Sequence, residues 1–86
     1  MIVRYFAAAA DAAQVPSEYI SPPDPHSPPF TPASLRALLL ARHPALANIL
    51  PHSLLAVQLR FVDWDDCSTL IPDSAEVAVV PPVSGG

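Results

Sequence analysis

Few side chains in this chain carry reactive groups, and the sequence does not gather them into a recognisable site. The single cysteine, Cys67, has no nearby base or helix start that would activate its thiol. His26, His43 and His52 stand in or beside proline-rich segments, without the spacing of metal ligands. The aspartates of the stretch DWDD, at positions 63, 65 and 66, lack the glycine and the distal glutamate of an EF-hand loop. We therefore expect no metal site, a half-buried thiol at a strand start and a solvated aspartate turn.

The C-terminal stretch VAVVPPVSGG offers a different kind of chemistry, that of a carboxylate at the tip of a narrow chain. Gly85 and Gly86 are the only glycines of the 86 residues, so every internal turn does without glycine. A tip without Cβ atoms can enter a channel that would exclude a side chain. Pro81 and Pro82 stiffen the base, and the segment PPVSGG can extend roughly 20 Å. A carboxylate is a poor electrophile, so chemistry there requires activation by another enzyme. A frayed terminus would account for a tail, but not for both glycines lying in it.

Composition restricts the class of protein. The 86 residues are 51% hydrophobic and 14% charged, which is typical of one small compact domain. The net charge of −4, with arginine but no lysine, argues against a nucleic-acid ligand and favours a partner with a basic docking face. The absence of lysine also leaves no internal amine as an acceptor for self-conjugation. The apolar runs are far shorter than the roughly 18 residues of a membrane span, so we expect a cytoplasmic protein without a membrane partner.

The N-terminal third combines an apolar run with many prolines. Residues 2–8 are rich in strand formers, and we expect a strand followed by a loop, although the alanines of 7–13 favour a helix by propensity. Seven prolines between 16 and 32 exclude a continuous helix or a central strand, and a short edge strand at 17–20 stays open. We expect a stiff surface loop rather than a proline-motif ligand, because no flanking basic residue has the required spacing.

The stretch TPASLRALLLARHP predicts the main helix. Thr31 can cap the first N–H groups, and Pro32 fits the first helical position. Three leucines fall on one helical face: Leu35, Leu38 and Leu39. A further helical turn is expected within 44–51.

The C-terminal half predicts strands separated by polar turns. Alternation over 54–62 indicates one strand with four apolar residues on one face: Leu55, Val57, Leu59 and Phe61. A short return strand is expected at 68–71, and a final strand at 77–80 whose continuous apolar character favours a central position. Trp64 lies in the turn between the expected strands at 54–62 and 68–71. It has two open interpretations, a partner contact or a lid over the sheet.

These elements predict an α+β fold in which one main helix packs on a mixed sheet of four to five strands. With the first and last strands parallel in the middle, this is the β-grasp, or ubiquitin-like, arrangement. We expect one domain at 1–80, including the proline-rich loop at 16–32, and a C-terminal tail at 81–86.

The last eleven residues, EVAVVPPVSGG, closely resemble the C-terminal signature of the MoaD-type small subunits of molybdopterin synthase. These subunits belong to the MoaD/ThiS group of ubiquitin-like β-grasp sulfur carriers. The stretches IVRYFA and LRALLLARHP and the passage from Leu54 extend the resemblance over most of the chain.

The resemblance implies a role for the tail. A ubiquitin-activating-type adenylyltransferase would use ATP to adenylate Gly86, and a sulfurtransferase or other persulfide donor would convert it to a thiocarboxylate. The tail (Pro81, Pro82, Val83, Ser84 and Gly85) would enter the large subunit of molybdopterin synthase, where the sulfur attacks cyclic pyranopterin monophosphate. Two transfers would build the dithiolene in a heterotetramer of two large and two small subunits. Catalysis would lie in the large subunit, and this chain would bind no cofactor.

The resemblance also implies an interface and leaves alternatives. Phe6 and Val80 match an apolar partner-contact patch, although the family often has phenylalanine where Val79 and Val80 stand. Two stretches depart from the family: the prolines of 16–32 put the second strand in doubt, and the turn PDSAE before the last strand is sterically less permissive than the frequent Asp-Gly turn. The alternatives are a sulfur carrier for thiazole or cysteine synthesis, a ubiquitin-like protein modifier, and a plain interaction module with an incidental tail.

Overall fold

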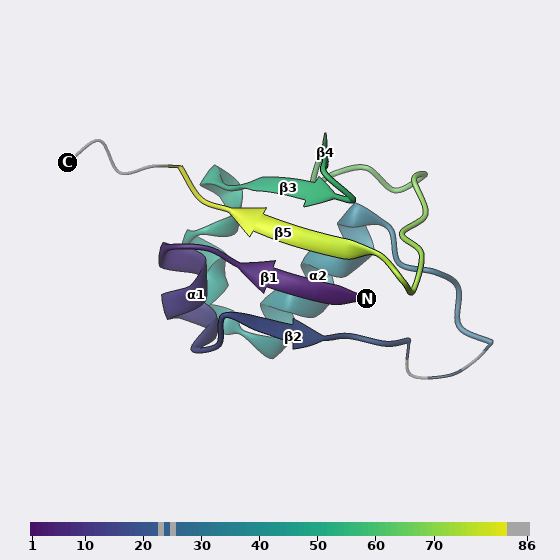
Figure 1. Cartoon of the computed structure of the whole chain (residues 1–86), viewed down its shortest axis with the longest axis horizontal. Coiled ribbons are helices and arrows are strands. Elements are labelled where there is room, and N and C mark those ends of the chain that lie inside the picture. Colours follow the sequence, from purple (N-terminus) through teal and green to yellow (C-terminus); the bar gives the residue numbers. More distant parts are fainter. Residues whose placement is uncertain (23, 25, 83–86) are drawn as a thin grey trace.

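The computed structural model describes residues 1–22, 24 and 26–82 and contains one mixed sheet (Figure 1). Its strands lie in the order β2-β1-β5-β3-β4. Their bounds are β1 Ile2–Tyr5, β2 Ser17–Tyr19, β3 Leu54–Val57, β4 Arg60–Val62 and β5 Glu76–Val80. β1 and β5 are parallel neighbours in the centre, and the other pairs are antiparallel. The predicted α+β architecture with parallel first and last strands is confirmed, as is the central position of β5, and the edge strand that the sequence left open forms as β2.

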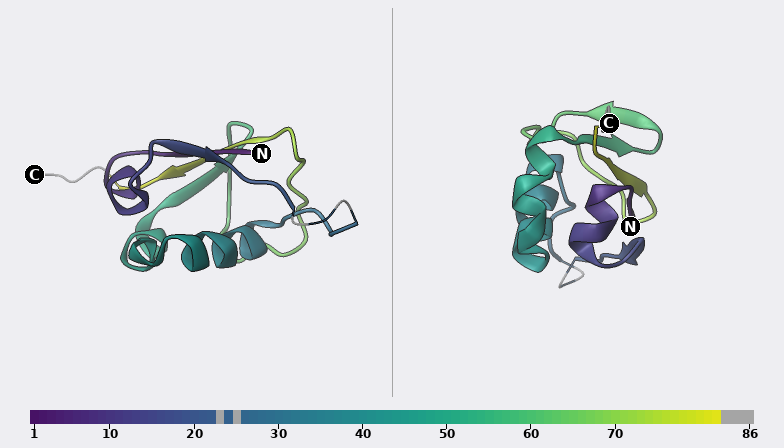
Figure 2. Two further views of the ribbon diagram at one scale, coloured as in Figure 1. Left: turned by 90° about the horizontal axis from the view of Figure 1, so that it is seen from below. Right: turned by 90° about the vertical axis from the view of Figure 1, so that its left-hand side faces the viewer.

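The main helix, α2 (Pro32–Arg42), lies across one side of the sheet (Figure 2). It begins as predicted: the Ser34 N–H donates to Thr31 Oγ1 at 3.2 Å, and the Thr31 N–H donates to Ser34 Oγ at 2.8 Å. This reciprocal cap satisfies two N–H groups at the helix start. Two 3₁₀ segments, η1 (Pro44–Asn48) and η2 (Leu50–His52), occupy the region where one further turn was expected. Within the described residues, no helix has the length and apolar character needed to cross a membrane.

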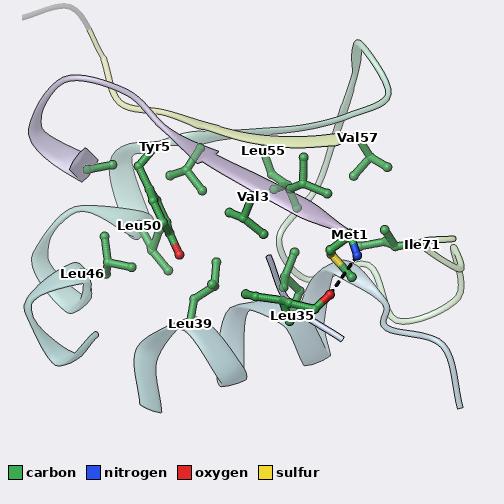
Figure 3. Close-up of a cluster of buried hydrophobic side chains, with 14 of the residues drawn as sticks. Met1, Val3, Tyr5, Leu35, Leu39, Leu46, Leu50, Leu55, Val57 and Ile71 are labelled. Carbon is green, nitrogen blue, oxygen red and sulfur yellow. Dashed lines mark hydrogen bonds between the residues drawn. The ribbon is translucent and has the colours of Figure 1, made fainter. Parts of the chain in front are cut away.

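The core lies between the sheet and α2 with its following 3₁₀ segments (Figure 3). Alternate strand residues point into it, because side chains along a strand alternate between the two faces. Buried side chains from the strands, from α2 with the 3₁₀ segments and from Ile71 fill this core. They include Val3, Tyr5, Leu35, Leu39, Leu46, Leu50, Leu55 and Ile71. The amino group of Met1 donates to the Ile20 carbonyl at 2.8 Å, which holds the start of the chain against the end of β2. This packing fixes the positions of the central strands.

Residues 7–13 differ from the expectation of a strand end and a loop. They form a short helix, α1 (Ala8–Ala13), and β1 ends at Tyr5. Ala9 and Ala13 are buried on one side of α1, and alanine has the highest helix propensity. The backbone turns into and out of this helix at Ala7 and Gln14, whose φ values are 49° and 63°. Local propensity and burial of the small alanine face together favour the helix.

The stretch 54–62 is not one strand, as alternation predicted, but a β-hairpin. β3 and β4 pair through Val57 and Arg60, and the turn between them consists of Gln58 and Leu59. Both turn residues have positive φ, 50° and 69°, which is the backbone of a tight two-residue hairpin turn. Such turns usually contain asparagine and glycine, so this sequence carries no sign of it. Leu59 is consequently 96% exposed at the hairpin tip, whereas the prediction placed it on one strand face with Leu55 and Val57.

The expected strand at 68–71 is also wrong. Ile71 alone forms a bridge, in which its N–H donates to the Phe30 carbonyl at 2.7 Å. The preceding residues instead form a loop organised by Asp66. The described residues between 20 and 29 contain neither helix nor strand, in keeping with their prolines.

Candidate functional site

The two faces of the sheet have different surroundings. α2, η1 and η2 cover the inner face (Figure 2), toward which the buried residues of the central strands point. The intervening residues point to the outer face, which no described element covers. Arg4 and Glu76 form an exposed ion pair of 3.3 Å from neighbouring strands on this outer face. The rest of the outer face, toward the end of β5, is apolar.

Six residues from four neighbouring segments form this outer-face patch: Phe6, Leu54, Ala56, Phe61, Ala78 and Val80. Strand register brings them together, since Leu54 lies opposite Val80, and Ala56 lies opposite both Ala78 and Phe61. Residues opposite one another in antiparallel strands share a face.

Phe6 joins the patch by continuing the alternation of β1, and its N–H donates to the Val79 carbonyl at 3.2 Å. Phe6, Leu54 and Phe61 are 48%, 54% and 68% exposed. Large exposed apolar side chains that gather on one face mark an interaction surface.

The tail begins next to this patch. β5 ends at Val80, Pro81 is buried against the domain, and Pro82 is exposed. Proline cannot continue a strand ladder, so the chain leaves the sheet here. The remaining predicted tail residues, Val83, Ser84, Gly85 and Gly86, lie outside the described residues. A protein that covers the outer-face patch therefore also meets the base of the tail.

The structure brings the two predicted interface residues, Phe6 and Val80, to the same end of the central strands. Sequence reasoning missed Leu54 and put Phe61 on the same face as Leu55, because it treated 54–62 as a single strand. The hairpin turn places Phe61 opposite Ala56 and therefore on the outer face. Residue types that favour positive φ, such as asparagine and glycine, would have indicated a turn at 58 and 59. Glutamine and leucine do not favour that backbone, so the sequence gives no sign of it.

The other candidate residues do not form a second reactive centre in the described part of the chain. Cys67 is exposed in a loop, and the expectation of a half-buried thiol at a strand start is wrong, because no strand forms at 68–71. Among the described residues, no group of three histidine, cysteine or acidic side chains is arranged to hold a metal ion. His43 contacts Glu18, whereas His26 and His52 are exposed in separate segments.

The aspartates after β4 organise their own loop. Asp66 accepts hydrogen bonds from the Thr69 hydroxyl at 2.6 Å and from the N–H groups of Thr69 and Ser68. These bonds, the Thr69 hydroxyl first, hold the pKa of the Asp66 carboxyl well below its usual range. Asp65 pairs with Arg36 on α2 at 2.8 Å. The loop is thus a structured turn fastened to the helix.

Trp64 lies partly buried over the core at the β4 edge. Its indole N–H donates to the Ser53 carbonyl at 2.9 Å, and its ring packs against the buried residues. The Ser53 hydroxyl in turn donates to the Ile49 carbonyl at 2.7 Å. These contacts support the lid, and since Trp64 is only partly buried, a partner contact stays open as well.

A polar network fastens the edge strand β2 to the end of α2. Glu18 accepts from the Tyr5 hydroxyl at 3.0 Å and from Arg42 at 2.7 Å, and it also contacts His43. Burial opposes ionisation of Glu18, but the bonds from Arg42, His43 and Tyr5 outweigh it and lower the pKa of this carboxyl. Burial, and then the bond to Glu18, raise the pKa of the Tyr5 hydroxyl. The network thus ties β2 and β1 to the end of α2.

Comparison with known proteins identifies the family. The family model described as "ThiS family" matches residues 3–86. The chain belongs to the ThiS family. It is 35% identical over 89 residues to the human protein named "Molybdopterin synthase sulfur carrier subunit", covering 98% of this chain and 91% of the human one. This confirms the MoaD/ThiS resemblance seen in the sequence.

Two solved structures share the fold. A Pyrococcus furiosus protein titled "putative molybdopterin converting factor, subunit 1" is 27% identical, with a TM-score of 0.74 and 95% of each chain covered. A Helicobacter pylori structure titled as a complex of subunits 1 and 2 of molybdopterin-converting factor has a TM-score of 0.66 at 24% identity, covering 99% of this chain and 96% of the other. The first of these likenesses confirms the β-grasp fold, and the second agrees with it.

Proposed function

We propose that this chain is a sulfur carrier, the small subunit of a molybdopterin synthase, whose Gly86 thiocarboxylate donates sulfur to cyclic pyranopterin monophosphate. The observation that carries the proposal is the identity of 35% to the human sulfur carrier subunit over 98% of this chain. The terminal Gly-Gly and the proline-stiffened segment before it fit a carrier whose reactive atom must enter another protein.

The proposed activation begins with attack of the Gly86 carboxylate on ATP. This releases pyrophosphate and forms an acyl adenylate on the activating enzyme. The terminal sulfur of a persulfide then attacks the acyl carbon and displaces AMP, which gives an acyl disulfide. A thiol attacks the donor's sulfur in that disulfide, breaks the S–S bond and leaves the thiocarboxylate on Gly86. The chain itself holds no cofactor in this scheme, since ATP belongs to the adenylyltransferase and the persulfide to the sulfur donor.

The outer-face patch is the proposed docking surface for the large subunit. Phe6, Leu54 and Val80 present apolar side chains beside the point where Pro81 begins the tail. The Helicobacter pylori title describes a complex between two such subunits, which supports a partner of this kind. Docking there would place Pro82 at the partner surface and direct the residues that follow it into the partner.

Intact-mass analysis tests the proposal. The chain is incubated with ATP, its activating enzyme and a persulfide donor, and we expect the mass gained when one oxygen is replaced by one sulfur. Omission of ATP and deletion of Gly86 are the controls, and neither should give the product. Addition of the large subunit and cyclic pyranopterin monophosphate should return the original mass.

Other results select the other functions. Attachment of the chain to lysines of other proteins would identify a modifier. Thiocarboxylate formation followed by transfer only in a thiazole or cysteine pathway would identify another carrier. Full function after deletion of Gly86 would reduce the chain to an interaction module and contradict the proposal.

A further inference from the structure

A groove lies between α2 and the loop that follows β4. It has a volume of about 840 Å³, and the 3₁₀ segments also border it. The residues that line it are Arg36, Leu40, Ala47, Leu50, Pro51, Asp63, Trp64 and Asp65. None of them belongs to the outer-face patch, although Asp63 also borders a surface hollow beside Leu54 and Phe61 of that patch.

The groove is preformed and mostly apolar. Trp64 is held in place by the hydrogen bond from its indole to the Ser53 carbonyl, so its ring is a fixed part of the lining. Leu50 is fully buried and Leu40 half-buried, whereas Ala47 and Pro51 are exposed. A volume of this size would suit a small ligand, but the exposed lining residues make an open groove. An open apolar groove fits a side chain presented by a partner protein.

The charges of the lining residues select the partner. Arg36 and Asp65 neutralise each other in an ion pair of 2.8 Å. Within the described residues, no hydrogen bond or ion pair engages the Asp63 carboxylate, which is exposed. The chain carries a net charge of −4 and no lysine. The groove therefore offers an unbalanced negative charge beside an aromatic and aliphatic surface.

We propose that this groove is a second docking site, which binds a partner segment that inserts one apolar or aromatic side chain against Trp64 and Leu40 and places an arginine or lysine beside Asp63. Burial of the apolar side chain supplies affinity, and the charge pair supplies selectivity. The site would let a partner hold the chain through residues other than those of the outer-face patch. This proposal rests on the groove alone and does not depend on the proposed sulfur transfer.

Trp64, the only tryptophan of the chain, reports occupancy directly. The probe is the blocked tetrapeptide Arg-Leu-Phe-Arg, titrated to millimolar concentration while Trp64 fluorescence and its indole NMR signal are followed. We expect a saturable change, and binding about fivefold weaker for Glu-Leu-Phe-Glu, which reverses the charge. The peptide Arg-Ser-Ser-Arg, which lacks the apolar side chains, should give no saturable change.

Two exposed alanines of η1 give a matched pair of variants. Ala47 lines the groove and Ala45 does not, so Ala47→Gln should abolish the response to Arg-Leu-Phe-Arg and Ala45→Gln should preserve it. Circular dichroism checks that both variants fold. No response in the unchanged protein, or equal responses in both variants, would overturn the proposal. A change in Trp64 fluorescence with protein concentration alone, accompanied by dimer formation, would assign the groove to a second copy and overturn it as well.

Discussion

Leu54 lies directly opposite Val80 across β3 and β5, with both side chains on the sheet face turned away from α2. Val80 is the last residue of β5, so this apolar pair stands where the chain leaves the sheet through Pro81. Under the proposed function, docking and the delivery of the tail would be coupled, because a partner that covers the pair also meets the start of the tail at Pro81. The central strands make this relationship rigid, since β5 is hydrogen-bonded on both sides.

The first prediction concerns this pair. Leu54→Ser should weaken binding of the large subunit about tenfold or more, because burial of a leucine side chain is worth about 1.5–3 kcal/mol. The fold should persist, since Leu54 is 54% exposed in the free chain. Isothermal titration calorimetry measures the affinity. Tyr19→Ser is the control, because Tyr19 is an exposed residue of the edge strand outside the patch. Equal affinities for Leu54→Ser and the unchanged protein would remove Leu54 from the interface.

The second prediction separates two leucines that sequence alternation placed on one face. Leu55→Ala should lower the free energy of unfolding by about 2–5 kcal/mol, because Leu55 is fully buried and the change leaves a cavity. Leu59→Ala should change it by less than about 0.5 kcal/mol, since Leu59 is exposed at the hairpin tip. Urea unfolding measures both. Similar losses for the two variants would favour the single strand over the hairpin.

The hairpin also explains why some of the molecule could be predicted from sequence and some could not. Thr31, Pro32 and the spaced leucines are local signals, and they predicted the start and face of α2. The turn at Gln58 and Leu59 has no such signal, because pairing of β3 with β4 and β5 imposes its positive φ values. Phe6 and Val80 could be named because the family resemblance covers the first strand and the C-terminal stretch. Phe61 could not, because its face depends on the register that this turn sets.

The third prediction follows from the backbone of that turn. The double change Gln58→Asn and Leu59→Gly should stabilise the fold by about 1 kcal/mol, because asparagine and glycine accept positive φ at lower cost. The entropy that glycine adds to the unfolded chain reduces the gain. Urea unfolding measures the difference. Leu70→Gly is the control: Leu70 is exposed in a loop and has no positive φ, so the change should be neutral or destabilising. Equal effects at the two places would argue against backbone strain in the turn.

The fourth prediction concerns pH and Glu18. The bonds from Arg42, His43 and Tyr5 lower the pKa of Glu18 from its ordinary value of 4.5. A carboxyl whose pKa is lowered on folding stabilises the folded state above its ordinary pKa, and this contribution is lost as the pH falls through the lowered value. Glu18→Gln should therefore reduce the free energy of unfolding by about 1–3 kcal/mol near neutral pH. The gap from the unchanged protein should shrink as the pH falls below 4.5.

Urea unfolding at neutral pH and at a series of pH values below the ordinary pKa measures this gap. Glu76→Gln is the matched control, since Glu76 also pairs with an arginine but its side chain is 55% exposed. Its effect should stay below about 1 kcal/mol, as expected for a surface ion pair. If the gap for Glu18→Gln were the same at every pH, the lost stability would come from packing, and the charged network between β2 and α2 would not be its source.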